Sequence, residues 1–350
     1  MAKVRFDKVG IKAINACVPK NVQKTKDLSY MLSDDAILGL ENSTGIKERR
    51  LATPEICTSD LCYEAAMQLI TDNSISPDSI DMLLFMSQTA DYKIPTTSTV
   101  LQRRLKIPKS CACLDLVNAC SGFVYALSSA YSFASMDGID RVLVLSGDTI
   151  SKILNKTDKI SYPVFGDAGT AVLVEKGNYG DSFFELGSNG EGYESIMIFA
   201  ENGGRNPINP NSYIEKEFAD KIKRSDLQMK MEGMDVFSFA ISTIPKSIKS
   251  IFDYSEKTDS DVDLYLLHQA NKYILNIIAK KLKINENKIP INIDRFGNTS
   301  SASIPLLLNS EFGQSRLTKK CMLCGFGAGL SWATAYIHLK DCIIGKLLEL

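Results

Sequence analysis

The sequence predicts an α/β fold made of two duplicated halves. Short apolar segments of strand length, such as 81–86 and 141–145, are separated by longer segments whose apolar residues recur with helical spacing. A further apolar segment at 263–267 then begins a second series with the same succession of elements. Strands that alternate with helices are typical of largely parallel sheets covered by helices.

Equal spacing of two pairs of residues supports the internal duplication. Cys120 and Gly147 are 27 positions apart, and so are Asn298 and Gly325. Both pairs occupy the same place in their series, with one helical segment between a turn and a strand-like segment. We therefore expect Cys120 and Asn298 at the tips of equivalent helices, facing one site.

Length and composition fit a globular protein with a large core. The chain has 350 residues, 45% of them hydrophobic, and its net charge of −1 argues against nucleic-acid binding over the whole surface. No apolar run reaches about 18 residues, so we expect no membrane span. The N-terminal sequence lacks a signal-peptide pattern, and the nine cysteines form no small disulfide framework, which predicts a cytoplasmic protein.

Each element of the first half follows from a local pattern. Residues 1–20 alternate as an extended segment that ends at Pro19, and Ser59 or Asp60 can cap the helix that follows. The other expected elements are strands at 81–86, 111–117 and 141–145, and helices at 97–105 and after Cys120.

The second half repeats this order and ends its first strand in a histidine. The expected elements are strands at 263–267, 290–293 and 321–324, and helices at 271–282 and 301–308. We divide the chain into an N-terminal half (1–175), an insertion (176–230) and a C-terminal half (231–350). The insertion is polar and contains a Gly- and Pro-rich loop, so we expect it to cap or narrow the site.

Two cysteine pairs could suggest a metal site. Cys111 and Cys113 form one pair, and Cys321 and Cys324 form the other. Both pairs lie in strand-like apolar runs, and the chain has only two histidines to complete a set of ligands. We therefore expect no metal.

Cys120 is the leading candidate for a reactive group. It lies where the strand-like segment 111–117 breaks into small residues before a helical segment. Unpaired N–H groups at a helix N-terminus favour a thiolate, and a thiolate is a nucleophile. The alternative is an unreactive structural thiol, because free cysteine is among the most buried residue types.

Three further features could contribute to the same site. His268 follows a buried strand, at the carboxyl end where α/β sheets place ligand-binding groups, although it could equally be a core residue. Asn298 could be an amide donor or only a turn residue. The glycine-rich loop at 325–329 has spare N–H groups that suit an oxyanion hole. The other histidine, His338, lies in a strand-like segment, and we expect it to be structural.

In this order, these residues and their motifs resemble one family. The chain is similar to the β-ketoacyl-acyl-carrier-protein synthase III branch of the thiolase-like condensing enzymes. The similarity extends over nearly the whole chain. It rests on the segments 43–50, 115–127, 165–169, 231–240, 267–271, 297–300 and 326–332.

The resemblance implies a five-layered α-β-α-β-α thiolase-like fold, a homodimer and a two-step reaction that needs no cofactor. Cys120 would take an acyl group from a coenzyme A or carrier-protein thioester. His268 and Asn298 would then hydrogen-bond the carbonyl of a malonyl-type extender on acyl carrier protein and stabilise the enolate left by decarboxylation. The enolate would attack the acyl-cysteine, as in fatty-acid or specialised acyl-chain biosynthesis.

The resemblance also implies roles for residues around the three catalytic ones. The amides of Cys120 and Ala328 would form the oxyanion hole. Phe326 would pack on the catalytic side chains, and Ile94 would reach into the acyl pocket of the other subunit. Asn271 and Lys272 match the substrate-binding region, and Lys272 begins a basic helix face for a carrier protein that also includes Lys280, Lys281 and Lys283.

The chain departs from the family pattern at several positions. Ala328 replaces a glycine, and Tyr273 stands where a carrier-binding arginine is common. Gly39 and Ser43 stand where fatty-acid starters have a coenzyme-binding tryptophan and an arginine. Without that stacking surface, acetyl-coenzyme A is a weaker candidate donor, which favours a specialised acyl chain.

Three alternatives to condensation stay open. A same-fold acyltransferase could move the acyl group to an amine or hydroxyl, a hydrolase could release it to water, and a non-catalytic subunit could shape a partner's pocket. The presence of both His268 and Asn298 favours condensation, because an enolate needs neutral hydrogen-bond donors.

Overall fold

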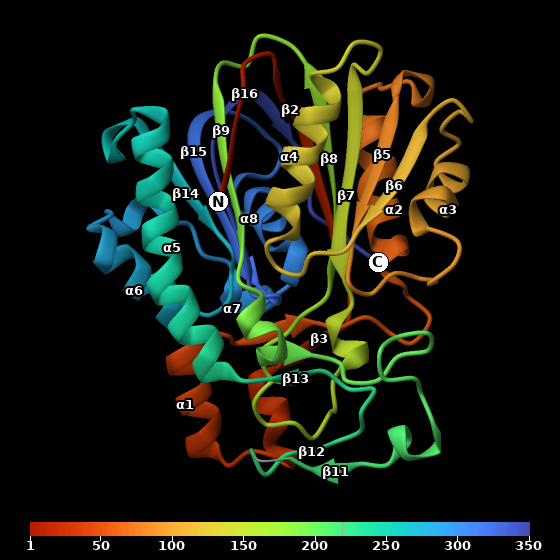
Figure 1. Ribbon diagram of the computed structural model, residues 1–350, viewed down its shortest axis with the longest axis vertical. Coiled ribbons are helices and arrows are strands. Elements are labelled where there is room, and N and C mark those ends of the chain that lie inside the picture. Colours follow the sequence, from red (N-terminus) through yellow and green to blue (C-terminus); the bar gives the residue numbers. More distant parts are fainter. Residues whose placement is uncertain (219) are drawn as a thin grey trace.

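The computed structural model describes residues 1–218 and 220–350, and it folds in layers (Figure 1). The first half forms a sheet in the order β6-β5-β7-β8-β2. β7 pairs in parallel with β5 and antiparallel with β8. The strands are β2 (Val9–Val18), β5 (Met82–Met86), β6 (Ala112–Leu116), β7 (Arg141–Asp148) and β8 (Ala168–Lys176).

The second half forms a sheet in the order β14-β15-β16-β9-β1. A short parallel pairing of β16 with β2, at Ile343 and Ile344, joins it to the first sheet. Near this seam, β17 (Leu348–Glu349) also pairs with β2. The other strands are β1 (Ala2–Phe6), β9 (Ser182–Ser188), β14 (Leu264–Leu267), β15 (Ser315–Gly327) and β16 (Ser331–Ile344).

Strand pairing shows how the halves correspond. In the first half, β2–β8 and β8–β7 are antiparallel pairs and β7–β5 is a parallel pair. In the second half, β9–β16 and β16–β15 are antiparallel pairs and β15–β14 is a parallel pair. This relation matches β2, β8, β7 and β5 to β9, β16, β15 and β14. It also matches the helix before β7 with the helix before β15, as the equal spacing in the sequence predicts.

Helices fill three layers around the two sheets (Figure 1). α4 and α8 lie between the sheets, α2 and α3 cover the outer face of the first, and α5 and α6 cover the outer face of the second. Along β5, Leu84 faces the central layer and Leu83 the outer one, as strand alternation requires. The helices are α2 (Thr58–Asp72), α3 (Thr97–Arg104), α4 (Gly122–Ala134), α5 (Gly233–Ser255), α6 (Lys272–Leu282) and α8 (Ser303–Phe312).

Small elements extend below these layers (Figure 1). They include the helix α1 (Asp34–Thr44) and the paired strands of the segment that follows β9. A buried ion pair holds that segment, because Nε of Arg224 lies 2.7 Å from Oδ2 of Asp158. The short strands are β3 (Val22–Lys24), β4 (Glu48–Arg50), β10 (Ile196–Met197), β11 (Lys216–Glu217), β12 (Lys223–Arg224) and β13 (Lys230–Met231).

Two predicted elements differ from the structure. Residues 290–293, predicted as a strand, pair with no strand, and the short helix α7 (Ile293–Phe296) begins at their end. The Ile291 side chain of this segment instead packs beside the outer helices of the second half. α2 begins earlier than predicted: Cys57 is its N-cap residue, and Asp60 accepts the N–H of Cys57 at 2.8 Å.

Candidate active site

Cys120 lies in the tight turn between β6 and α4. The preceding residue, Ala119, has a φ of 32°, which is unusual for a residue with a side chain. This turn carries the thiol to the face of the second half. There Sγ of Cys120 lies 3.6 Å from Oγ of Ser300.

Two glycines at the end of β15 make room for that turn. A methyl group on Gly327 would lie 3.1 Å from Sγ of Cys120 and 2.9 Å from its Cβ. A methyl group on Gly325 would lie 2.9 Å from the carbonyl oxygen of Cys120. The glycine-rich loop predicted from the sequence therefore allows close backbone approach to the cysteine, a use of glycine that needs no special φ.

The thiol is protonated in this substrate-free state. The pKa of Cys120 is raised to about 12, mainly by burial; the hydrogen bond to Ser300 lowers it and the nearby Asp148 carboxylate raises it. The expectation of a resting thiolate was therefore wrong. Removal from water outweighs the partial charge of the helix N-terminus, and the proton must leave when the thiol attacks.

His268 directly follows β14 and is fixed on three sides. Its backbone N–H donates to the carbonyl of Cys324, and Nδ1 lies 2.7 Å from Oγ of Ser303. The ring of Phe326 packs edge-on against the imidazole, with centroids 5.2 Å apart. Burial lowers the pKa of His268 to about 3, so the imidazole is neutral near pH 7.

Asn298 precedes α8 and anchors a turn against the first half. Its N–H donates to Val164 O at 2.9 Å, and its carbonyl accepts the N–H of Gly166 at 3.0 Å. Its side-chain Oδ1 accepts the N–H of Ser300 at 2.9 Å. This bond orients the amide and leaves the Nδ2 protons without a partner in the described chain, so they are available to a ligand.

One short segment connects the three candidate residues. It runs from Asn298 to Ser303, and it touches the Cys120 thiol through Ser300 and the His268 ring through Ser303. Its Ser301 hydroxyl donates to the buried carboxylate of Asp148 at 2.8 Å, across the two halves. Sequence reasoning missed these three serines and Asp148, although the serine-rich run after Asn298 was a usable signal.

The oxyanion-hole candidate Ala328 follows Gly327, which contacts Cys120. Gly329, not Ala328, takes the positive φ of this turn, at 129°. Ala328 therefore does not adopt the left-handed backbone conformation that favours glycine. The Ser331 hydroxyl donates to the Ala328 carbonyl at 2.8 Å and fixes the turn.

Among the described residues, the remaining candidates make no hydrogen bond to the thiol. Ile94 is 86% exposed on the surface. Asn271 caps α6, because its Oδ1 accepts the N–H of Ile274 at 2.7 Å. Lys272 is exposed and packs beside Gly45 of the turn after α1.

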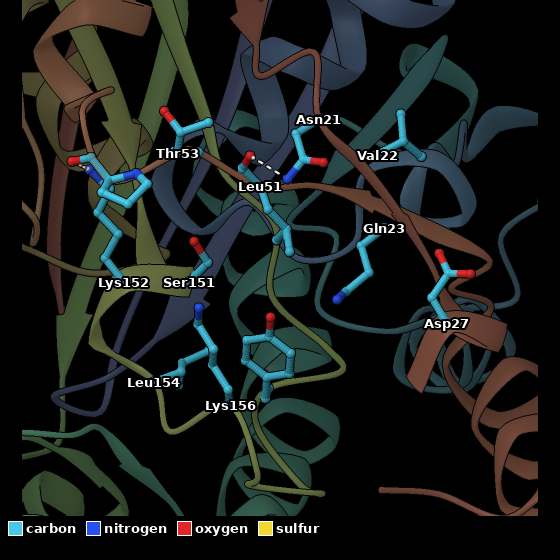
Figure 2. A pocket seen from close by; sticks show the side chains of 13 residues that line it. Asn21, Val22, Gln23, Asp27, Leu51, Thr53, Ser151, Lys152, Leu154 and Lys156 are labelled. Carbon is cyan, nitrogen blue, oxygen red and sulfur yellow. Dashed lines mark hydrogen bonds between the residues drawn. The ribbon is translucent and has the colours of Figure 1, made fainter. Parts of the chain in front are cut away.

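Several cavities lie outside this site. One, about 800 Å³, has Gln23 and Asp27 on one side and Lys152 and Leu154 on the other (Figure 2). The Lys152 ammonium donates to two backbone carbonyls there, so it is not a free cation. Another, about 510 Å³, lies within the segment after β9. Among residues 1–218 and 220–350, no group of three or more His, Cys, Asp or Glu side chains could hold a metal ion.

A duplicated five-layered α/β fold, with a cysteine and an asparagine before its two central helices, defines the thiolase-like class of acyl-transferring enzymes. The model for 3-oxoacyl-[acyl-carrier-protein] synthase III matches residues 114–190, and the model for its C-terminal part matches residues 252–339. The chain therefore belongs to the β-ketoacyl-acyl-carrier-protein synthase III family, and it is an acyltransferase of the condensing type.

Individual relatives support this assignment along the whole chain. A β-ketoacyl-[acyl-carrier-protein] synthase III of Rhodopirellula baltica is 35% identical, over 93% of this chain and 97% of the relative. One of Lactococcus lactis is 36% identical, over 92% and 96%. The crystal structure of a 3-oxoacyl-(acyl-carrier protein) synthase from Burkholderia xenovorans superimposes with a TM-score of 0.93, at 31% identity, over 100% and 99%.

Proposed function

We propose that this protein forms an acyl-enzyme on Cys120 and condenses it with a malonyl-type thioester. The observation that carries the proposal is the segment from Asn298 to Ser303. It holds one amide donor and contacts both the thiol and the neutral imidazole. Neutral donors around a nucleophile suit a reaction in which negative charge develops on oxygen.

In the first step, the Cys120 sulfur attacks the carbonyl of an acyl thioester. The thiol loses its proton, the donor thiol leaves and takes up a proton, and the acyl group stays on Sγ. The amides of Cys120 and Ala328 hold the tetrahedral oxyanion. Gly327 and Gly325 support this role, because they let β15 bring the Ala328 turn against Cys120.

In the second step, the extender loses carbon dioxide. The electron pair of the broken carbon–carbon bond moves onto the thioester carbonyl oxygen, where His268 and Asn298 donate hydrogen bonds. The low pKa of His268 supports this role, because a neutral ring can donate without titrating near pH 7. The enolate carbon then attacks the acyl-cysteine, and the Cys120 thiolate leaves.

The segment between β9 and α5 shapes the acyl pocket. Ile196, Met229 and Met231 of this segment pack with Phe165, which lies in a bridge to Asn298. This packing supports the capping role expected of the insertion, whose limits (176–230) stay a prediction. Flexible methionine side chains would let the pocket fit chains of different shape.

A homodimer would close the site. β6 is the edge strand of its sheet; Val117, directly after it, is 74% exposed, and Ile94, shortly before α3, is 86% exposed. An open strand edge with apolar neighbours favours pairing with a second copy. In that dimer, Ile94 would enter the acyl pocket of the other subunit.

The partner that delivers the extender is an acyl carrier protein. We place the protein in the cytoplasm. α6 offers Lys272 and Lys280 as exposed charges, whereas Lys281 donates to the carbonyl of Ile241 and is less available. Tyr273 stacks on Phe237 with centroids 5.8 Å apart, which gives the carrier an apolar contact. No helix in the described ranges is long and apolar enough to cross a membrane.

The test is to supply the acylated enzyme with a malonyl-carrier thioester. We expect a β-ketoacyl product and one carbon dioxide per product. Cys120→Ala should lose the product entirely, and the control Cys57→Ala, at another partly buried cysteine, should keep it. Transfer to an amine or hydroxyl without carbon dioxide would instead support the same-fold acyltransferase, and transfer to water would support a hydrolase.

A further inference from the structure

The contact between His268 and Ser303 decides what the imidazole can do. Nδ1 lies 2.7 Å from the Ser303 hydroxyl, and both residues are 1% exposed. A neutral imidazole carries one ring proton, so one nitrogen donates and the other accepts. The direction of this single hydrogen bond therefore determines which nitrogen faces the substrate with a proton.

The surroundings of Ser303 indicate that direction. Nδ1 of His268 is the one acceptor found for the Ser303 hydroxyl within the described chain. If Nδ1 donated instead, the buried hydroxyl proton would have no acceptor, which is unfavourable. The hydroxyl therefore donates to Nδ1, and the ring proton lies on Nε2.

We propose that Ser303 is the positioning residue that holds His268 in the Nε2–H form, so that the ring donates toward the enolate oxygen. This inference rests on the proposed function of His268. Ser303 begins α8 and lies five residues after Asn298, so the same short segment sets both donors. Phe326 packs on the ring edge-on and prevents it from turning away.

The chemistry shows which step depends on this arrangement. During decarboxylation the carbon–carbon bond breaks, carbon dioxide leaves, and the electron pair reaches the carbonyl oxygen. The Nε2–H group donates to that oxygen, and its proton stays on the ring. With the proton on Nδ1, Nε2 would present a lone pair to the same oxygen and oppose the charge. Acylation of Cys120 does not need the Nε2 proton.

The tautomer can be observed directly. The chain has only two histidines, so the His338→Gln variant labelled with ¹⁵N-histidine shows the ring nitrogens of His268 alone. We expect a protonated, pyrrole-type Nε2 and an unprotonated Nδ1 in the full chain. In Ser303→Ala on the same background, both tautomers should be populated. A protonated Nδ1 with Ser303 present would overturn the proposal.

Kinetics provide the second readout. Ser303→Ala should slow decarboxylation by the acylated enzyme about 10- to 100-fold, by analogy with the loss of residues that orient metal-bound histidines. Acylation should change less than about twofold, and Ser303→Thr should recover most of the loss. Ser255→Ala is the matched control, because it removes another buried serine hydroxyl, which donates to the carbonyl of Ile251 at 2.7 Å within α5, without touching His268.

Equal losses in acylation and decarboxylation for Ser303→Ala would show a merely structural role and contradict the proposal. The nuclear magnetic resonance experiment distinguishes a wrong role for Ser303 from a wrong proposed function. If the acylated protein decarboxylates no malonyl thioester, the proposed function fails, whereas the position of the ring proton is read without any turnover.

Discussion

Ser300 of the second half places its hydroxyl 3.6 Å from the Cys120 thiol of the first half. The two residues lie before equivalent helices of a duplicated fold, so the duplication itself creates the contact. The seam between the halves is therefore the place where the chemistry is assembled, and changes on either side of it should alter the reactivity of the thiol.

Replacing Gly327 with alanine should block acylation of Cys120. The new methyl group would lie 3.1 Å from Sγ and 2.9 Å from Cβ of the cysteine, closer than ordinary packing allows. We expect at least a tenfold slower acyl-enzyme formation, by analogy with the roughly 10²-fold cost of small misplacements in active sites. Intact mass against time measures it. Gly39→Ala, where the methyl group has open space, should acylate normally.

Alkylation of Cys120 by iodoacetamide should keep accelerating as the pH rises above 9. The folded-state pKa is about 12 and the ordinary value is 9.0, so the thiolate fraction is still growing there. The raised pKa also makes folding stability depend on pH. The neutral buried thiol contributes stability below pH 9, and this contribution is lost as the pH rises toward 12. A rate that reaches a plateau near pH 7, after subtraction of Cys120→Ala, would contradict the protonated resting state.

Asn298→Asp should impair decarboxylation more than Asn298→Ala. The carboxylate would face the enolate and repel it, whereas alanine only removes a donor, which typically costs about 10²–10³ in rate. Carbon dioxide release from the preformed acyl-enzyme measures the step. Equal rates for the two variants would mean that no negative charge develops beside Asn298.

Arg224→Ala should destabilise the segment between β9 and α5. The guanidinium is buried and lies 2.7 Å from both Asp158 and Asp220, so its removal leaves the buried Asp158 carboxylate without its charge partner. Breaking such a pair costs about 3–5 kcal/mol. Arg316→Ala, which breaks an exposed pair with Asp341, should cost below about 1 kcal/mol. Urea unfolding of both variants measures the loss of unfolding free energy. Similar losses in the two variants would contradict a stabilising role for the buried Arg224 ion pair.

Much of the layered fold could be predicted from the sequence, because apolar periodicity is a local signal. The strands around Leu84 and Leu266 and the helix after Cys120 were predicted within a few residues. The strand at 290–293 was not found, because a segment of only four residues with alternating isoleucines fits a packed loop as well as a strand. Tertiary packing, which the sequence does not display, decided between them.

Cys120, His268 and Asn298 stay predicted site residues, whereas the protonation of the site could not be predicted from the sequence. Their places at element ends made Cys120, His268 and Asn298 candidates, the family resemblance implied their roles, and the structure connects them through Ser300 and Ser303. Which serine touches which group depends on the geometry of one turn. The raised pKa of Cys120 depends on burial, which a sequence pattern at a helix N-terminus does not reveal.

The most direct test of the account is the intact mass of the protein after incubation with a panel of acyl-coenzyme A and acyl-carrier thioesters. We predict a gain of one acyl group that is lost in Cys120→Ala, and the thioester that produces it would identify the donor. If no thioester labels the protein, or if Cys120→Ala is labelled as well, Cys120 is not the nucleophile and the proposed function is wrong.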